Sequence, residues 1–548
     1  MRLLACLLLL AQIAASPTQA QLYAADQGPA WGAEQRRAFY IQDQGSRLIP
    51  LAWLLALHDA GGPFLRDGLS RFGYLGTPGR VGLPIGFTTG EWDGTTYAGL
   101  TCSACHTRQI SVGPVQYRVD GGPALADFQA FLKALDSATQ AVLTQDAAFD
   151  AFSAAVGSDK AALRIALGTW TGPFHALIAG ALPSQPWGPG RLDAVGMILN
   201  RLTVLDIGAG PDHTIPANIH VANAPARYPF LWNASRQDRT QWPGFAANGS
   251  DTLALGRNVG EVYGVFGVFE PKPWFFATGI NYKRENSVNY HGLNTVEQLI
   301  KRIGPPRFPG LIDTALAAQG QRVWERKTAQ GGCVECHGIR PGEHRLGGDP
   351  TWATPIRAVG TDRAEWAVMA WQTHDAGVMN GASIPFLANQ HISPQGPAVA
   401  VLQTAVLGSI VEHIDPLATG RSGSAPPGLE ELLARAFRGP DEPPPEPFSY
   451  ESRVLQGVWA AAPYLHNGSV PTLADLLEPP ATRPARFRIG PAYDLERVGL
   501  AREQAPGPAL TTTGCEDVQS GNSRCGHDFG TRLPAREKRA LLEFMKGL

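Results

Sequence analysis

The chain has little charge for its length and almost no imbalance of charge. Lys, Arg, Asp and Glu make up 17% of its 548 residues, and 46 basic residues against 48 acidic ones leave a formal net charge of −2. Such a chain has no bulk attraction for nucleic acid, so we expect no nucleic-acid partner. Beyond residue 20 it also lacks an apolar run long enough to span a bilayer, and we expect no membrane span in the mature chain.

Methionine and cysteine are scarce, with five and seven residues, whereas the 62 glycines and 45 prolines are plentiful. Because glycine and proline disfavour long regular elements, loops must carry much of the chain. Helical spacing of apolar residues predicts helices within 124–150, 311–325 and 534–546, and alternation over 107–122 predicts a hairpin. The expected fold class is mainly α, with extensive irregular loops and few short strands.

The first twenty residues have the composition of a leader. Met1 and Arg2 precede an apolar run from Leu3 to Ala15, and small residues follow before Gln21. This pattern predicts a secretory signal peptide over residues 1–20, with a retained membrane anchor as the alternative. We therefore expect a periplasmic or secreted protein whose cysteines lie in an oxidising compartment.

Four of the six cysteines outside this leader form two copies of one motif, Cys-x-x-Cys-His. The copies comprise Cys102, Cys105 and His106, and Cys333, Cys336 and His337. This is the attachment signature of c-type haem, in which two thiols bind the porphyrin and the adjacent histidine binds the iron. A redox dithiol or a zinc site would not need the histidine after both pairs. The sequence predicts two covalently bound haem c groups.

The last two cysteines, Cys515 and Cys525, lie ten residues apart in a segment containing Gly, Ser and Asn. In an exported protein such a pair predicts a disulfide. Gly526 and His527 follow directly, so the bridge would stiffen a loop that presents His527.

Further stretches carry a family resemblance. They are Gly99–Thr107, Asp120–Pro123, Gly256–Val262, Tyr464–Ser469 and Gly526–Gly530. In this order they resemble the di-haem cytochromes related to the rubber oxygenase RoxA. These form a branch of the bacterial di-haem cytochrome c peroxidase superfamily, which also includes MauG. The resemblance spans most of the mature chain, and residues 464–473 point to this superfamily rather than to any two-haem carrier.

The resemblance implies two cytochrome c-like haem domains. Pro305 and Pro306 mark the boundary between an N-terminal haem domain, 21–305, and a C-terminal haem domain, 306–548. By the resemblance, the N-terminal haem is catalytic and the C-terminal haem relays electrons. We expect the segment 448–548 to pack across both domains.

The second axial ligand of the C-terminal haem decides how that haem works, because two strong protein ligands suit electron transfer. His337 would be the first ligand. By the resemblance the second is a histidine near the C-terminus, which corresponds to His527. His466 and Met379 are the alternatives.

For the N-terminal haem, the resemblance implies aromatic side chains from the middle of the chain. Trp232, Trp242 and Phe245 are candidate pocket walls or electron-relay residues. A peroxidase also needs a group that moves a proton near the distal face, and Glu261 is the candidate. Arg257 would hold a haem propionate. The alternative is a structural pair of Glu261 with Arg257, four residues earlier.

These expectations describe an exported haem-dependent oxidoreductase that acts on peroxide or dioxygen, possessing a cytochrome c peroxidase-like activity. The alternatives are a RoxA-like dioxygenase that cleaves an apolar alkene and a non-catalytic electron-transfer cytochrome. A small redox protein would be the electron donor of a peroxidase. Peroxidases of this group often hold calcium between domains, but no acidic cluster indicates calcium here.

Overall fold

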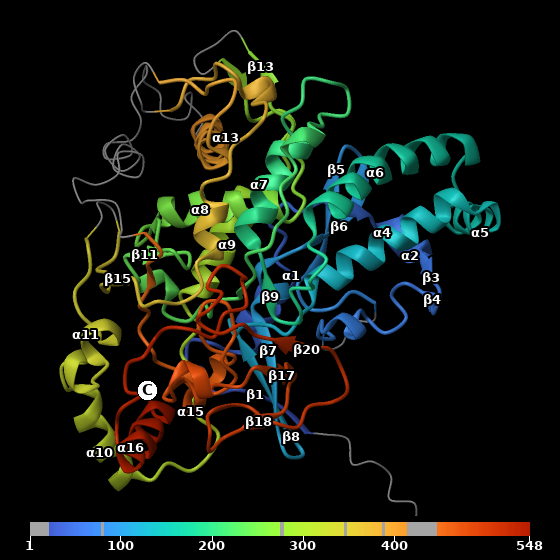
Figure 1. Cartoon of the computed structure of the whole chain (residues 1–548). Coiled ribbons are helices and arrows are strands. Elements are labelled where there is room, and N and C mark those ends of the chain that lie inside the picture. The colour runs from blue at the N-terminus through green and yellow to red at the C-terminus, as the bar shows by residue number, and fades with distance from the viewer. Residues whose placement is uncertain (1–20, 78–81, 275–278, 345–347, 386–389, 414–446) are drawn as a thin grey trace, which may run out of the picture.

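The computed structural model describes residues 21–77, 82–274, 279–344, 348–385, 390–413 and 447–548. The predicted signal peptide, 1–20, lies outside these described residues. Helices dominate the architecture, which confirms the mainly α expectation (Figure 1). The α-helices are α1 (Ala33–Ile41), α2 (Leu51–Ala56), α3 (Cys102–Cys105), α4 (Phe128–Thr144), α5 (Asp146–Val156), α6 (Lys160–Ala181), α7 (Ala194–Leu205), α8 (Asp251–Gly264), α9 (Tyr290–Ile300), α10 (Thr314–Trp324), α11 (Val334–His337), α12 (Ala364–Val368), α13 (Ala398–His413), α15 (Leu473–Leu476) and α16 (Ala535–Lys546).

The strands are short and form two three-stranded sheets and several two-stranded ladders. One sheet has the order β1 (Gln21–Ala24), β8 (Val115–Asp120), β7 (Thr107–Val112), and the other β2 (Ile49–Pro50), β6 (Thr95–Leu100), β5 (Phe87–Trp92). The two-stranded ladders are β3 (His58–Asp59) with β4 (Gly62–Pro63), β9 (Arg191–Leu192) with β10 (Ala226–Arg227), β11 (Arg239–Thr240) with β12 (Ala246–Ala247), β13 (Lys272–Pro273) with β14 (Ile280–Asn281), β15 (Ile356–Arg357) with β16 (Tyr450–Glu451), β17 (Arg486–Arg488) with β20 (Ala509–Thr511), and β18 (Tyr493–Asp494) with β19 (Gly499–Leu500).

The predicted hairpin over 107–122 is confirmed as the antiparallel pair β7–β8. A second hairpin, β5–β6, lies in a glycine-rich stretch for which no strand is predicted from the sequence. Its turn residues Asp93 and Gly94 both have positive φ, +44° and +70°. Asp-Gly between two runs of strand formers is a strong hairpin signal, so the sequence contained the evidence for this element.

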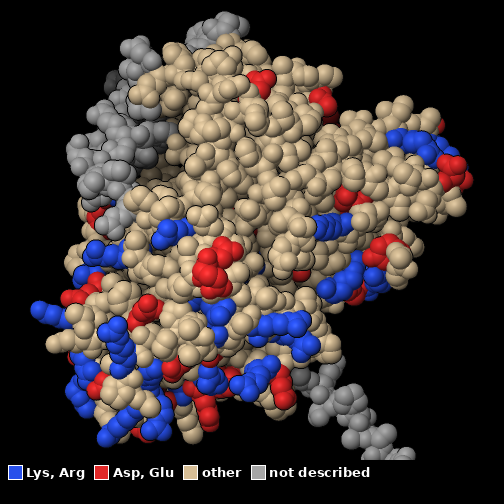
Figure 2. All heavy atoms as spheres, viewed as in Figure 1, with Lys and Arg blue, Asp and Glu red and all other residues tan. Residues whose placement is uncertain are grey.

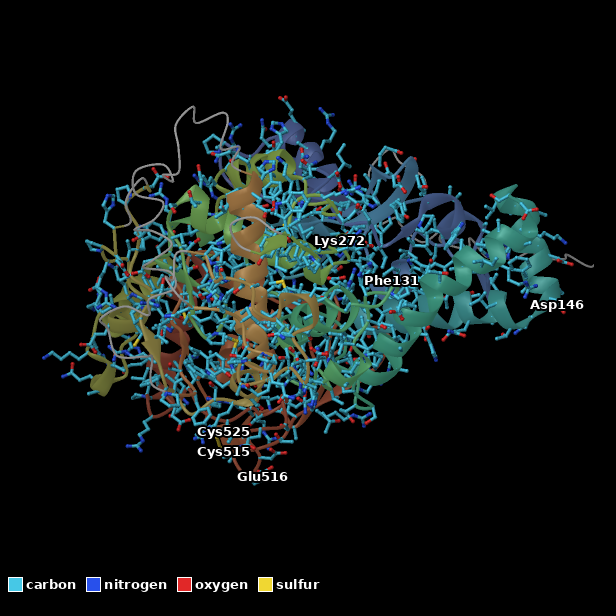
Figure 3. All side chains as sticks on the ribbon, turned by 90° about the horizontal axis from the view of Figure 1, so that it is seen from above. Phe131, Asp146, Lys272, Cys515, Glu516 and Cys525 are labelled. Atoms are coloured by element: carbon cyan, nitrogen blue, oxygen red, sulfur yellow. A yellow bond between two sulfur atoms is a disulfide. The ribbon has the colours of Figure 1, made fainter. Side chains whose placement is uncertain are left out.

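The helix predicted within 124–150 is present but ends earlier. The chain forms α4 and then, after Gln145, the separate helix α5. The Asp127 carboxylate caps α4 by accepting the N–H of Ala130 at 2.9 Å. Together with α6, these helices project from the body of the molecule, with Asp146 at the far end (Figures 1 and 3).

The last helix packs along the helix before the second haem motif. α10 and α16 come so close that a Cβ on Gly320 would lie 1.9 Å from the carbonyl oxygen of Ala540, so only glycine fits there. Arg326 closes the pair with two hydrogen bonds to Glu537, at 2.7 and 2.8 Å. The C-terminus is thus held beside the second motif. Charged side chains gather over this lower part of the molecule, whereas few lie on the upper part near α7 (Figure 2).

One buried apolar cluster joins segments from both halves of the chain. It includes Trp31, Phe39 and Trp232 from the first half and Trp459 and Leu541 from the second. Asp120 braces the edge of this cluster. Its buried carboxylate accepts hydrogen bonds from Trp31 (2.8 Å), Arg36 (2.6 Å) and Tyr40 (2.6 Å).

The segment after residue 448 contacts the N-terminal half directly. The carbonyl of His466 accepts the N–H of Arg227 at 2.8 Å, and that of Pro491 accepts the N–H of Ser111 at 2.7 Å. β18 accordingly lies beside β7 and β8 (Figure 1). The division into two haem domains stays a prediction. Across the described ranges, no helix is both long and apolar enough to cross a membrane.

Candidate haem sites

The first Cys-x-x-Cys-His motif lies between the two three-stranded sheets. β6 ends at Leu100, the single turn α3 carries both cysteines, and β7 begins directly after His106. The Cys102 thiol contacts the side-chain oxygen of Gln44 at 3.2 Å. The His106 ring donates from Nδ1 to the carbonyl oxygen of Pro229 at 2.9 Å. This bond fixes the ring and leaves Nε2 as the nitrogen for a metal.

Burial shapes the titration of this site. It lowers the pKa of His106 to about 4, so the imidazole is neutral, the form that binds metal. Burial, with a smaller contribution from the charge of Glu261, raises the pKa of Cys105 to about 12. Glu261 acts on the Cys102 thiol in the same direction. The charge of Glu261 therefore acts on both thiols, and the pKa of Glu261 is itself raised by burial.

The direct partner of Arg257 is a glutamate other than Glu261. Its guanidinium binds the Glu297 carboxylate at 3.0 Å and the Asn248 side chain at 2.8 Å. Glu261 instead accepts a 3.4 Å hydrogen bond from Gln241. The structure thus brings Arg257 and Glu261 into one buried polar cluster beside the first motif, without pairing them directly.

The second motif opens onto a cavity. α10 leads through a short 3-10 turn to Cys333, and α11 carries Cys336 and His337. The cavity holds about 1230 Å³ of space outside the protein atoms, counting its open mouth. Both thiols and His337 line it. Other lining residues come from distant segments, including Arg227, Phe230, Trp242, Trp324, Tyr450, Arg453, Tyr464, His466, Leu477, His527, Phe529, Leu541 and Met545.

Two histidine rings face one another across this cavity. The ring centres of His337 and His527 are 6.2 Å apart. Metal–imidazole bonds of about 2.0–2.1 Å on both sides, plus about 1 Å from ring centre to nitrogen, would place two ring centres roughly 6 Å apart. His337 Nδ1 donates to the carbonyl of Arg453 at 2.7 Å, as His106 does to Pro229. The residues present therefore fit a haem with two histidine ligands.

The loop that carries His527 is held on several sides. The Cys515–Cys525 disulfide predicted from the sequence is present and closes the loop just before it (Figure 3). Buried Arg483 donates to the carbonyl of Gly526 at 2.7 Å and to that of His527 at 3.1 Å. Gly526, with φ of +76°, packs so tightly on Gly360 that a Cβ would lie 2.4 Å away. These contacts fix the backbone on both sides of the ring.

The alternative ligands occupy different places. His466 lines the same cavity, but its ring is stacked on Tyr450, with ring centres 3.8 Å apart. Burial lowers its pKa to about 3, so it is a neutral wall residue in this arrangement. Met379 is buried in a separate apolar cluster with Ile207 and Val259.

Two of the three aromatic candidates lie at or behind the second cavity, and the third is exposed. Trp232 is fully buried and stacks on Phe230, with ring centres 4.6 Å apart. Phe230 and Trp242 line the second cavity. Phe245 lies beside β12 with 40% of its surface exposed. The tertiary structure thus places Trp232 and Trp242 toward the second motif, although they were expected at the first.

Two arginines that support the sites were missed from the sequence. Arg483 holds the loop of His527, and Arg453 lines the cavity and accepts the hydrogen bond of His337 through its carbonyl. The Arg453 atom Nη1 is buried without a hydrogen-bond partner among the described residues. A haem propionate would satisfy it. No local pattern marks either arginine, because their partners are distant backbone carbonyls.

These features define a haem c protein, and the comparisons with known proteins agree. Residues 449–488 match the family model described as RoxA-like, cytochrome c-like, so the chain carries such a domain over a short stretch. The uncharacterized protein y4iJ of Sinorhizobium fredii is 29% identical, over 94% of this chain and 92% of its own length. The uncharacterized protein y4iM of the same organism is 25% identical, over 65% and 67%.

The matched stretch contains Arg453, His466 and Arg483, all of which serve the second cavity or its ligand loop. The disulfide is consistent with an extracytoplasmic location. Within the described ranges, no group of three or more His, Cys, Asp and Glu side chains is placed to hold a metal ion.

Proposed function

We propose that this chain is an exported di-haem c-type cytochrome that works as an oxidoreductase. The haem on Cys102 and Cys105 would react with peroxide or dioxygen, and the haem on Cys333 and Cys336 would relay electrons. The observation that carries this proposal is the His337–His527 pair, 6.2 Å apart across a cavity lined by the second motif's thiols. Two histidine ligands suit electron transfer.

The protein's own contribution begins with the ligands. Each proximal histidine gives its Nδ1 proton to a backbone carbonyl, which orients the ring and strengthens Nε2 as a donor. The haem groups, when bound, would supply the redox chemistry of iron. Glu261, whose pKa is raised by burial, would hold a proton beside the first site and pass it to an oxygen atom of the bound substrate.

The second candidate function is a RoxA-like oxygenase acting on an apolar alkene. The match of residues 449–488 to a RoxA-like family model favours it. Both functions need one iron with a free face, whereas a pure electron carrier needs none. The oxygenase should bind dioxygen at the first site, and the peroxidase should consume hydrogen peroxide with a reduced small redox protein as donor.

The first experiment counts the haems and reads their spin states. The pyridine haemochrome of the purified protein should give two haems per chain, and each double variant, C102A/C105A or C333A/C336A, should retain one. Electron paramagnetic resonance should show one high-spin and one low-spin ferric signal, and carbon monoxide should bind one reduced haem. Two low-spin haems that refuse carbon monoxide would overturn the enzyme proposal and leave an electron carrier.

A further inference from the structure

The two proximal histidines are joined by three hydrogen bonds and the stretches of backbone between them. His106 Nδ1 donates to the carbonyl of Pro229 at 2.9 Å. The next carbonyl, that of Phe230, accepts from Nη2 of Arg453 at 2.8 Å. The backbone carbonyl of Arg453 in turn accepts from His337 Nδ1 at 2.7 Å. Arg453 therefore touches the support of both rings, with its side chain toward one and its backbone toward the other.

The surroundings make this connection rigid. The Arg453 guanidinium lies over the Phe230 ring at 4.2 Å, and Phe230 stacks on Trp232. Nε donates to the Gln237 side chain at 2.9 Å and lies 3.5 Å from the Glu451 carboxylate. The Arg453 residue is only 5% exposed. The Arg453 guanidinium cannot move without displacing the Pro229–Phe230 peptide, whose Pro229 carbonyl holds the His106 ring.

We propose that Arg453 couples the two predicted haem sites, acting as one positioning residue for both proximal histidines. This inference rests on the proposed function, since it needs a haem at each motif. A shift of the Phe230 carbonyl moves the neighbouring Pro229 carbonyl, which holds His106, and a shift of the Arg453 backbone moves the carbonyl that holds His337. Such hydrogen bonds to the ligand tune the reduction potential of the iron. The buried positive charge of Arg453 also favours the reduced state of both haems. The Nη1 atom of Arg453 is buried without a hydrogen-bond partner among the described residues, and it could donate to a propionate oxygen of a bound haem.

The test replaces Arg453 in the holoprotein and reads both haems separately. In R453M, the g-values of both ferric signals should shift, and both midpoint potentials should move lower in a potentiometric titration followed by absorption. The matched control is R191M. Arg191 is also buried, and it binds the Asn467 carbonyl and the Asn522 side chain rather than the Pro229, Phe230 or Arg453 carbonyl. R191M should leave the g-values of both haems at their wild-type values; the potentials are not compared, because the charge of Arg191 also acts on His466 in the second cavity.

The conservative variant R453K distinguishes the effect of the hydrogen bonds of Arg453 from the effect of its charge. It also replaces R453M in the measurements if R453M does not accumulate. Lysine keeps the charge but cannot donate to Phe230 and Gln237 at once, so potentials should partly recover while both g-values stay shifted. The proposal is overturned if only one haem changes in R453M, if R191M shifts both haems equally, or if R453K matches the wild type. Haem counting on the wild type keeps these outcomes apart from failure of the proposed function, which a count below two would indicate.

Discussion

The two Cys-x-x-Cys-His motifs are alike in sequence but sit in different surroundings. The first lies on a single turn between two sheets, with Glu261 and Arg257 in a polar cluster nearby. The second follows α10 and faces a large cavity that brings a second histidine within 6.2 Å. The proximal ring is held in the same way at both, through Nδ1 and a backbone carbonyl. The residues that would attach each haem are thus close together in the sequence, whereas the residues facing the other side of each haem come from distant segments.

The largest effect is expected from removing His527, the proposed distal ligand of the second site. His527 has φ of +52°, which glycine adopts without strain, so H527G should fold. It should convert the low-spin haem to a high-spin one that binds carbon monoxide, making the two sites alike, and added imidazole should restore the low-spin spectrum. H466F is the matched control and should keep its low-spin signal. Retention of that signal in H527G, with its loss in H466F, would reverse the ligand assignment.

The next largest effect is expected from the buried hydrogen-bond network around Asp120, at the end of the hairpin that follows the first motif. Asp120 has a fully buried carboxylate that binds Arg36, Trp31 and Tyr40. D120A should lower the free energy of unfolding by about 3–5 kcal/mol, because it leaves buried donors without a partner. Denaturant unfolding followed by circular dichroism measures this loss.

The control for Asp120 is the exposed ion pair of Asp26 with Arg307. D26N should cost less than about 1 kcal/mol. The low-spin signal of the second site should be unchanged in both variants. Equal losses for D120A and D26N would show that the buried network does not frame the first site.

A smaller effect is expected from the disulfide, which serves only the second site. Replacing Cys515 and Cys525 by serine should cost roughly 2–3 kcal/mol for a loop of this length. Because the bridge precedes His527, the variant should lose its low-spin signal at a lower temperature than the wild type. The carbon monoxide spectrum of the first site should not change. If heating releases His527 at the same temperature with and without the bridge, the loop is held by its other contacts, those of Arg483 and Gly360 among them.

The smallest effect is a pH dependence at the second cavity. Burial, followed by the charges of Arg227 and Arg191, lowers the pKa of His466 from 6.5 to about 3. The unfolded chain therefore binds a proton below pH 6.5 that the folded chain refuses, so stability falls as the pH decreases from 6.5 toward 3. H466F should flatten this dependence by up to about 1.4 kcal/mol per pH unit. The exposed His291 gives the control H291Q, which should keep the wild-type slope in urea titrations at several pH values.

Much of the local structure was predictable from the sequence. The β7–β8 hairpin, α10 and α16 follow from periodicity, because each has one face that must be buried. The disulfide followed from cysteine spacing in an exported chain. The β5–β6 hairpin was missed although Asp93 and Gly94 marked its turn, since the surrounding glycines suggested irregular structure. The helix α8 was also missed, because the stretch around it is rich in loop residues.

The sequence by itself determined the two attachment motifs, since thiols and histidine within five residues need no help from the rest of the chain. Only the tertiary structure decided which distant groups face them. It placed His527 opposite His337, stacked His466 on Tyr450, and set Arg453 between the supports of both proximal rings. The physical reason is the distance along the chain over which the interacting groups lie. The residues of an attachment motif are neighbours in the sequence and need only local backbone geometry. A distal ligand or a shared hydrogen bond depends on how segments hundreds of residues apart bury their apolar surfaces together.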